Sequence, residues 1–171
     1  MNVRDADRKT RLADAAIDVL GTGGVRALTH RAVDARAGLP QGTCGYHFPS
    51  RPALLTAALT RIAELDLLES TGEDLAAVLA SWAGPRAART RARFMLMLDP
   101  QARAELGPSA ARLAGGFVER ATVLFGSEER ARLAIALIDG LLLDELTRGT
   151  VTDEQRRTRL AAVHEIVTTG R

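Results

Sequence analysis

The sequence contains one cysteine, Cys44, and aromatic residues make up only 4% of its 171 positions. A single thiol cannot form an internal disulfide, which is typical of proteins that fold in a reducing compartment. With so few aromatic rings, any core must be built mainly from leucine, alanine, valine and isoleucine. The longest apolar run, residues 133–143, is interrupted by Asp139 and Gly140 and is shorter than the about 20 residues that a membrane-spanning helix needs. We therefore expect no contact with a membrane.

Motifs for catalysis and metal binding are also missing. The sequence has no Gly-x-Ser-x-Gly elbow, no phosphate loop of the Walker type and no pair of histidines on one helical face. Its three histidines, His30, His47 and His164, lack the spacing of metal ligands, and one cysteine cannot make a structural zinc site. We therefore expect neither an enzyme nor a metal site nor a cofactor.

Charge is nearly balanced, with 23 basic and 21 acidic residues and a net charge of +2. Residues 1–51 carry eight basic and five acidic groups, which gives +3, whereas the rest of the chain carries 15 basic and 16 acidic groups, which gives −1. A small positive excess is compatible with contact to an anionic polymer such as DNA, without establishing it. The first eight residues alternate in charge and lack the apolar stretch of a signal peptide, so we expect a cytoplasmic protein.

Apolar residues recur with a helical period along the whole chain, and no stretch shows sustained alternation of period two. The pattern predicts three short helices followed by about six longer ones. The expected helices cover residues 12–20, 30–37, 40–48, 51–68, 72–83, 85 to near 100, 108–125, 128–148 and 153–169. We therefore expect an all-α chain, in which an N-terminal three-helix head precedes a domain of roughly six helices.

Two of the short helices have the features of a helix-turn-helix. Thr29 is a candidate N-cap for the first of them, because its hydroxyl can accept a hydrogen bond from the first helical turn. Gly38 ends that helix and permits a tight turn, since glycine takes positive φ freely. The next helix, about nine residues long, is then free to lie in the major groove of DNA. In it, Gln41 can make a bidentate contact to a base edge, and Gly42 lets the backbone approach the duplex closely.

The segment AGLPQGTCGYHFPSR, residues 37–51, resembles the DNA-binding signature of the TetR family of bacterial transcriptional regulators. The resemblance extends over roughly residues 8–60, and the stretch LIDGLLL, residues 137–143, looks like the family's eighth helix, which usually joins a dimer interface. It implies a homodimer that binds a palindromic operator in double-stranded DNA, usually as a repressor, and that is released by an unidentified small-molecule effector. The implied domains are a helix-turn-helix DNA-binding domain over residues 5–51 and a ligand-binding and dimerisation domain over residues 52–171.

Matching the signature position by position implies a DNA-contacting face. Thr29 would cap its helix and touch phosphate, Arg51 would contact phosphate, and Gln41 would face the groove. The implied DNA-binding residues are Thr29, His30, Gln41, Gly42, Thr43, Tyr46, His47 and Arg51. The alternative for Tyr46 and His47 is that they are ordinary surface and core residues of a small helical head.

Three positions depart from the family pattern. Asp34 stands where the family usually has a small apolar residue, so its carboxylate must reach solvent or an arginine, Arg31 or Arg36. Gly45 replaces a larger side chain, and a glycine inside a helix costs about 1 kcal/mol relative to alanine. Cys44 replaces a larger apolar residue; such a cysteine is most often a small buried hydrophobe, and a redox switch is the alternative.

The C-terminal domain offers candidates for an effector site but no motif. They are the bulkiest apolar residues between positions 70 and 120, together with the one acid inside the apolar run. The candidate ligand-binding residues are Trp82, Phe94, Met97, Leu98, Phe117 and Asp139. The same residues fit an ordinary core, and Asp139 fits a hydrogen bond or an arginine pair near a dimer interface. Four nearby arginines, Arg86, Arg89, Arg91 and Arg93, are expected on a solvated helix face, with an anionic effector or acidic partner as the alternative.

Two other functions remain compatible with the sequence. The first is a ligand-independent DNA-binding or adaptor protein whose C-terminal body only dimerises. The short chain and the few aromatic residues are compatible with this alternative. The second is a small helical enzyme or binding module without DNA activity. A lack of affinity for duplex DNA, even at low salt, would favour the second.

Overall fold

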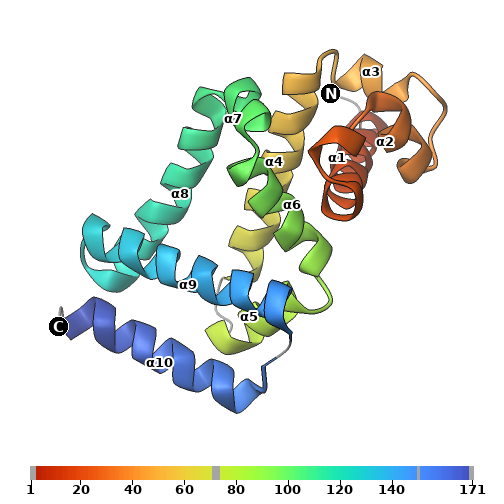
Figure 1. Ribbon diagram of the computed structural model, residues 1–171. Coiled ribbons are helices and arrows are strands. Elements are labelled where there is room, and N and C mark those ends of the chain that lie inside the picture. Colours follow the sequence, from red (N-terminus) through yellow and green to blue (C-terminus); the bar gives the residue numbers. More distant parts are fainter. Residues whose placement is uncertain (1–2, 71–73, 150, 170–171) are drawn as a thin grey trace. The chain divides into compact units, whose positions relative to one another are not determined.

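The computed structural model describes residues 3–70, 74–149 and 151–169. Within these ranges it contains ten α-helices, one short 3-10 helix and no strand, which confirms the all-α prediction. The elements are α1 (Val3–Gly23), η1 (Val25–Ala27), α2 (His30–Ala37), α3 (Thr43–His47), α4 (Arg51–Glu69), α5 (Leu75–Ala83), α6 (Ala87–Leu98), α7 (Pro100–Leu106), α8 (Pro108–Phe125), α9 (Glu128–Arg148) and α10 (Asp153–Thr169) (Figure 1). None of these described helices is long and apolar enough to cross a bilayer.

The structure has a helix that the periodicity did not separate. The segment expected to form one helix from residue 85 to near 100 ends at Leu98, and α7 follows it. The carboxylate of Asp99 accepts a hydrogen bond from the Ala102 N–H at 2.8 Å, and Pro100 stands at the first helical position. A proline there has no N–H to continue the preceding helix and is already preorganised for the next one. Of the helix expected over residues 72–83, positions 72 and 73 lie outside the described residues.

The chain divides into two compact units. Unit 1 is formed by Met1–Leu68 and Ala88–Ala111, and unit 2 by Glu69–Ala87 and Arg112–Arg171. Unit 1 therefore contains α1 to α4, α6 and α7, whereas unit 2 contains α5, α9, α10 and most of α8. The segment 5–51, expected to bind DNA, is part of a larger packed body that also includes α4, α6 and α7.

The core of unit 1 forms where α1, α2, α4 and α6 pack together. The apolar stripe expected on α1 is buried, with Leu12, Ala16 and Leu20 fully inaccessible, and Leu55 of α4 joins the same cluster. The contact between α1 and α6 is very close at Gly21, because a Cβ there would collide with the carbonyl oxygen of Ala88. Burial of the leucine side chains in this cluster, at roughly 1.5–3 kcal/mol each, stabilises unit 1.

Arginines that were expected on a solvated face of α6 are partly buried inside unit 1. The Arg89 Nε lies 3.0 Å from one carboxylate oxygen of Asp66 on α4, and an Arg93 guanidinium nitrogen lies 3.5 Å from the other. The side chains of Asp66 and Arg89 are only 5% and 9% exposed. The solvated-face prediction is therefore wrong for Arg89 and Arg93, because a carboxylate on α4 receives them. Arg91 is exposed, and Arg86 pairs with Glu69 in unit 2 at 3.1 Å.

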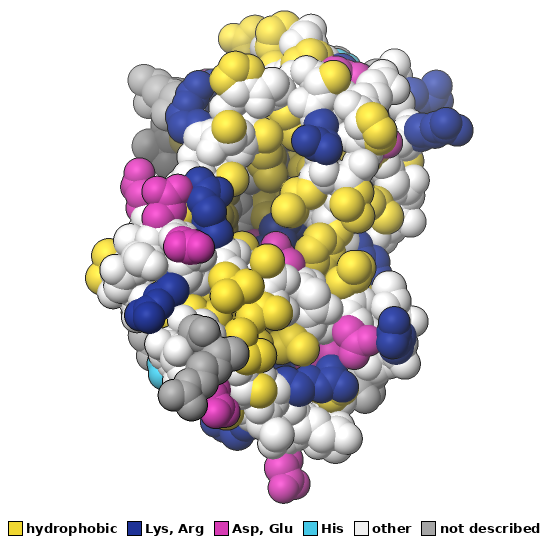
Figure 2. Space-filling view, turned by 60° about the vertical axis from the view of Figure 1, so that its left-hand side comes forward, with side chains coloured by type: hydrophobic (Ala, Val, Ile, Leu, Met, Phe, Trp, Pro, Cys, Tyr) yellow, Lys and Arg dark blue, Asp and Glu magenta, His cyan; other side chains and the backbone are white. Residues whose placement is uncertain are grey.

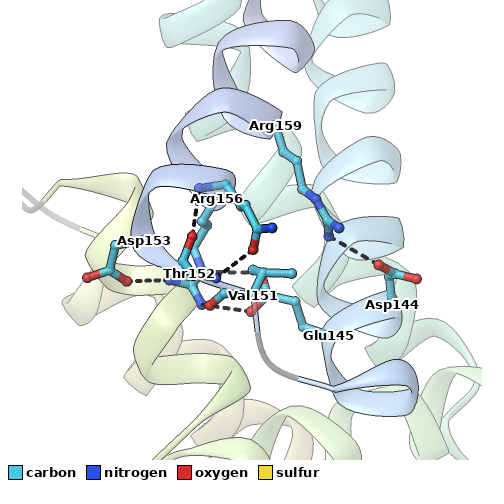
Figure 3. A network of polar contacts seen from close by, with 8 residues as sticks. Asp144, Glu145, Val151, Thr152, Asp153, Arg156 and Arg159 are labelled. Atoms are coloured by element: carbon cyan, nitrogen blue, oxygen red, sulfur yellow. Dashed lines mark hydrogen bonds and ion pairs between the residues drawn. The ribbon is translucent and has the colours of Figure 1, made fainter.

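In unit 2, α9 and α10 lie side by side and antiparallel (Figure 1). Ala134 of α9 packs against Val163 and Val167 of α10 in a small apolar cluster. At one end of this helix pair, Arg156 donates from Nε and one terminal nitrogen to the two carboxylate oxygens of Glu145, at 3.1 and 2.9 Å (Figure 3). Both side chains are almost completely buried, and the hydrogen bonds that Glu145 accepts raise the pKa of the Arg156 guanidinium. A doubly hydrogen-bonded ion pair therefore fixes the register of α10 on α9.

Candidate nucleic-acid interface

Helix α2 begins and ends as the sequence predicts. The Thr29 hydroxyl accepts a hydrogen bond from the Ala32 N–H at 3.1 Å, which confirms its role as N-cap. Gly38 adopts the left-handed conformation, with φ 63° and ψ 36°, and its N–H donates back to the Ala35 carbonyl. A side chain at this position would be strained, so glycine is required for the turn.

Helix α3 is shorter than expected, five residues instead of about nine. Residues 40–42 form a turn, because Gly42 has φ 97° and cannot belong to a right-handed helix. The Thr43 hydroxyl donates to the Pro40 carbonyl at 2.6 Å, which holds this turn closed. The α2–turn–α3 arrangement is a helix-turn-helix whose second helix has little more than one turn (Figure 1).

The outer side of α3 is exposed and polar. Tyr46 is 81% exposed, although an isolated large aromatic side chain is normally covered by its neighbours. Gln41 and Gly42 are exposed as well, and Thr43 is half-buried. The Tyr46 ring meets the His47 ring edge-on, with centroids 5.0 Å apart, so His47 orients a ring that otherwise stays exposed. This surface can hydrogen-bond and stack against an external partner.

Three of the implied contact residues make bonds inside the head instead of pointing outward. His30 donates from Nε2 to the Phe48 carbonyl at 2.7 Å. The side chain of His47 is only 3% exposed, and its Nε2 lies 3.7 Å from a carboxylate oxygen of Asp5 on α1. The Arg51 guanidinium donates to backbone carbonyls and is about one third exposed. In this structure these three residues support the head, and the accessible part of the implied set is Thr29, Gln41, Gly42, Thr43 and Tyr46.

The prediction for Asp34 is wrong. It was expected to reach solvent or an arginine, but Asp34 is buried, 2% exposed, and accepts hydrogen bonds from the backbone N–H groups of Gly42 and Cys44. Arg36, one of the two expected partners, pairs instead with Asp18 of α1 at 2.7 Å. Sequence reasoning identified the unusual residue but not its role, because the amides that it binds lie eight and ten positions further along the chain.

Cys44 is completely buried. Burial, with a smaller contribution from the nearby Asp34 charge, raises the pKa of its thiol to about 11. A redox-active cysteine needs an accessible thiolate near neutral pH. Cys44 therefore fits the description of a small core residue, and the structure gives no support to the redox alternative.

The candidate effector-binding residues are divided between the two units. Phe94, Met97 and Leu98 belong to unit 1, where Met97 is 48% and Leu98 69% exposed. Trp82, Phe117 and Asp139 belong to unit 2; Trp82 is buried and donates from its indole nitrogen to Glu69 at 3.1 Å. The buried acid of the α9 segment is Glu145, and Asp139 is partly exposed. Arg156 on the next helix is the sequence feature that could have indicated a buried Glu145, because a buried carboxylate needs a cationic partner.

Within the described ranges, no group of three or more histidine, cysteine, aspartate and glutamate side chains could hold a metal ion. The exposed side chains of Thr29, Gln41 and Tyr46 offer hydrogen bonding and stacking at α3 and at the start of α2. These are the interactions with which short helices read base edges and contact phosphates in DNA.

Comparison with known proteins agrees with this geometry. Residues 12–58 match the family described as "Bacterial regulatory proteins, tetR family", and residues 68–169 match "Tetracyclin repressor-like, C-terminal domain". The HTH-type transcriptional repressor KstR of Rhodococcus jostii (strain RHA1) is 37% identical over 68 residues. That match covers 40% of this chain but only 31% of KstR, so the chain spans less than a third of that repressor.

Solved structures resemble almost the whole chain. A TetR-family member (SCO1917) from Streptomyces coelicolor A3 is 31% identical, with 92% of this chain and 98% of that one covered and a TM-score of 0.72. The multidrug binding protein EbrR in complex with ethidium is 30% identical, with 91% and 98% covered and a TM-score of 0.71. Both the head and the C-terminal helices of the chain thus have counterparts of the same fold.

Proposed function

Since the chain belongs to the TetR family and is thus a transcriptional regulator with a helix-turn-helix, we propose that it is a repressor that binds a palindromic operator as a homodimer and is released by a small-molecule effector. In this proposal residues 5–51 bind DNA, and residues 52–171 bind the effector and dimerise. In the same proposal the protein acts in the cytoplasm, and its partner there is double-stranded operator DNA.

The observation that carries the DNA-binding part is the exposure of Tyr46 on α3. A large aromatic residue left 81% exposed on the second helix of a helix-turn-helix is placed to contact a groove or its phosphates. Gln41 at the start of the same segment is exposed and can read a base edge through two hydrogen bonds. Thr29 adds a hydroxyl at the start of α2, where phosphates bind favourably.

Exposed apolar side chains of unit 2 support the homodimer. Val123 and Leu124 of α8 are 85% and 76% exposed, and Leu133, Leu143 and Ile166 on α9 and α10 are each more than 40% exposed. Figure 2 shows hydrophobic side chains gathered on the face that it presents. A second copy of the chain would cover such residues, and two-fold symmetry would then place the two α3 helices in successive major grooves, about 34–36 Å apart.

The effector part rests on the relatives. EbrR has been crystallised with ethidium, with proflavin and with malachite green. By analogy, an effector would bind better to a conformation of the dimer whose two heads are wrongly spaced for the operator. It can shift the population only by the difference between its affinities for the two conformations.

Selection from genomic or random duplex fragments with purified protein tests the proposal. We expect recovery of an inverted repeat, and binding that falls steeply as salt rises, because phosphate neutralisation supplies much of the affinity. Analytical ultracentrifugation should give a dimer. A strictly monomeric protein, or one without affinity for any duplex at low salt, would overturn the proposal. Operator binding that no small molecule reverses would favour the ligand-independent alternative.

A further inference from the structure

The first turn of α3 has no capping side chain of its own. Its N-cap is Gly42, which lacks a side chain, and the helix contains only five residues. Short helices are marginal, because few hydrogen bonds offset the conformational entropy lost in ordering the first turn. Gly45 in the middle of α3 weakens the helix further, because glycine has a lower helix propensity than alanine. The orientation of α3 must therefore be fixed from outside the helix.

Asp34 on α2 supplies the missing cap. Its Oδ2 accepts a hydrogen bond from the Gly42 N–H at 2.8 Å, and its Oδ1 accepts one from the Cys44 N–H at 2.7 Å. Both carboxylate oxygens are used, and the residue is buried. Hydrogen bonds to an ionised acceptor are short and strong, and negative charge is favourable at the start of a helix. The two bonds fix both the position of α3 and its rotation relative to α2.

The same contact changes what the start of α3 offers to DNA. Free amides at a helix N-terminus attract phosphate, but here two of these amides already bind a carboxylate of the chain. The charge of Asp34 opposes the approach of a phosphate to this turn. The first turn of α3 therefore lacks the usual phosphate anchor, and binding must come from the side chains that α3 and the turn before it display, chiefly Tyr46 and Gln41.

We infer that Asp34 is a positioning residue for sequence discrimination: it fixes α3 so that Gln41, Thr43 and Tyr46 meet the bases in one register, while its charge lowers general affinity for DNA. The inference rests on the proposed function, because it concerns how α3 reads an operator. Asp34 acts through the Gly42 and Cys44 amides and makes no contact with DNA itself.

The test compares two duplexes, the operator that the wild-type protein selects and a scrambled duplex of equal length and composition. Asp34→Ala should weaken operator binding by about tenfold or more, since α3 loses both hydrogen bonds to the carboxylate. Its affinity for the scrambled duplex should stay equal or rise by about two- to threefold, since one negative charge is removed. Asp34→Asn keeps one acceptor oxygen and should lie between the wild type and Asp34→Ala on the operator. A merely structural role would instead reduce binding to both duplexes together.

Asp7→Asn is the matched control for charge, because it removes one carboxylate from an exposed position on α1. It should leave the ratio of operator to scrambled affinity unchanged. Amide hydrogen exchange gives a readout independent of DNA: the Gly42 and Cys44 N–H groups should exchange faster in Asp34→Ala, while the Ala32 N–H, bonded to Thr29, should not change.

Three results separate the possible failures. The inference is overturned if Asp34→Ala has the same ratio of operator to scrambled affinity as the wild type, which includes an equal loss of affinity for both duplexes. A wild-type protein that binds neither duplex at low salt overturns the proposed function. Should Asp34→Ala fail to fold, the same comparison with Asp34→Asn decides, because that side chain has nearly the same shape.

Discussion

Arg51, at the start of α4, forms an ion pair with Glu105 on α7, and the Arg51 Nε lies 3.3 Å from a Glu105 carboxylate oxygen. The same guanidinium donates to the carbonyl oxygens of Leu28 and Val25, at 2.6 and 2.8 Å. One side chain thus connects the turn that precedes α2 with α4 and α7. The family resemblance implies a phosphate contact for Arg51, so its role can be tested by separating stability from DNA binding.

Arg51→Ala should lower the free energy of unfolding by roughly 2–3 kcal/mol, because two carbonyls lose a charged donor and Glu105 loses its counter-ion. Denaturant unfolding measures this loss. Glu105→Gln should cost less, since Arg51 keeps both carbonyl partners. Weaker DNA binding by Arg51→Ala without any loss of stability would instead identify Arg51 as a direct phosphate contact.

Tyr46→Ala should weaken binding to all operator sequences, whereas Gln41→Ala should change the preferred base at one position of each half-site. The difference follows from contact type: a groove-edge or phosphate contact adds affinity, and a bidentate base contact adds about 1–3 kcal/mol of discrimination. Gel-shift titrations against a set of single-base operator variants measure both. If the two substitutions leave affinity and base preference as in the wild type, α3 does not face DNA.

Two glycines around α3 should respond in opposite ways to substitution by alanine. Gly45 has helical backbone and open space around its missing Cβ, so Gly45→Ala should stabilise the protein by about 1 kcal/mol, or roughly 2–4 °C in Tm. Gly42 has equally open space but φ 97°, so Gly42→Ala should destabilise by about 1–2 kcal/mol. Thermal unfolding followed by circular dichroism distinguishes them. A loss of stability in Gly45→Ala would show that α3 is not helical there.

The thiol of Cys44 should make stability depend on pH in the alkaline range. Its pKa is raised from 9.0 to about 11 by burial and by the Asp34 charge. Unfolding therefore releases a proton between these pH values, and the stability present below pH 9 is lost as pH rises towards 11. The stability difference between wild type and Cys44→Ala should shrink by about 2–3 kcal/mol over this range. A difference that stays constant from pH 8 to 11 would contradict the buried, protonated thiol.

Breaking the pair of Glu145 and Arg156 in unit 2 should be costly. Glu145→Gln removes the buried counter-ion of Arg156, and such losses typically cost about 3–5 kcal/mol. Glu128→Gln is the matched control, because Glu128 and its partner Arg132 are both 64% exposed. The expected loss in the free energy of unfolding is below about 0.5 kcal/mol. Urea unfolding of both variants measures the contrast; equal small losses would mean that the buried pair does not fix α10 on α9.

Local chemistry made much of the fold predictable from the sequence. The N-cap of α2 depends on Thr29 and an amide three residues away, and the end of α2 depends on the conformational freedom of Gly38. Apolar residues at helical spacing likewise identified the buried stripe of α1. In each case the physical cause lies within one or two helical turns of the residue that reveals it.

The parts that could not be predicted depend on partners distant in the chain. Asp34 accepts hydrogen bonds from the Gly42 and Cys44 N–H groups on the far side of the turn. Arg89 forms an ion pair with Asp66 on another helix. The periodicity of residues 85–106 is compatible with one kinked helix or with two, and the cap from Asp99 decides for two. The sequence predicts Tyr46 and His47 alike as DNA contacts, and only the packing of the head separates His47, which is covered, from Tyr46, which is exposed.

The absence of a side chain at Gly21 has a consequence for exchanging heads between regulators. Because the backbone of α6 occupies the space that a Cβ at this position would need, the close contact between α1 and α6 tolerates only glycine. A chimera that takes α1 from another protein would keep this contact only if the donor sequence also has glycine at position 21. Alanine there would lift α6 away from the transplanted helix before any difference in DNA contacts came into play.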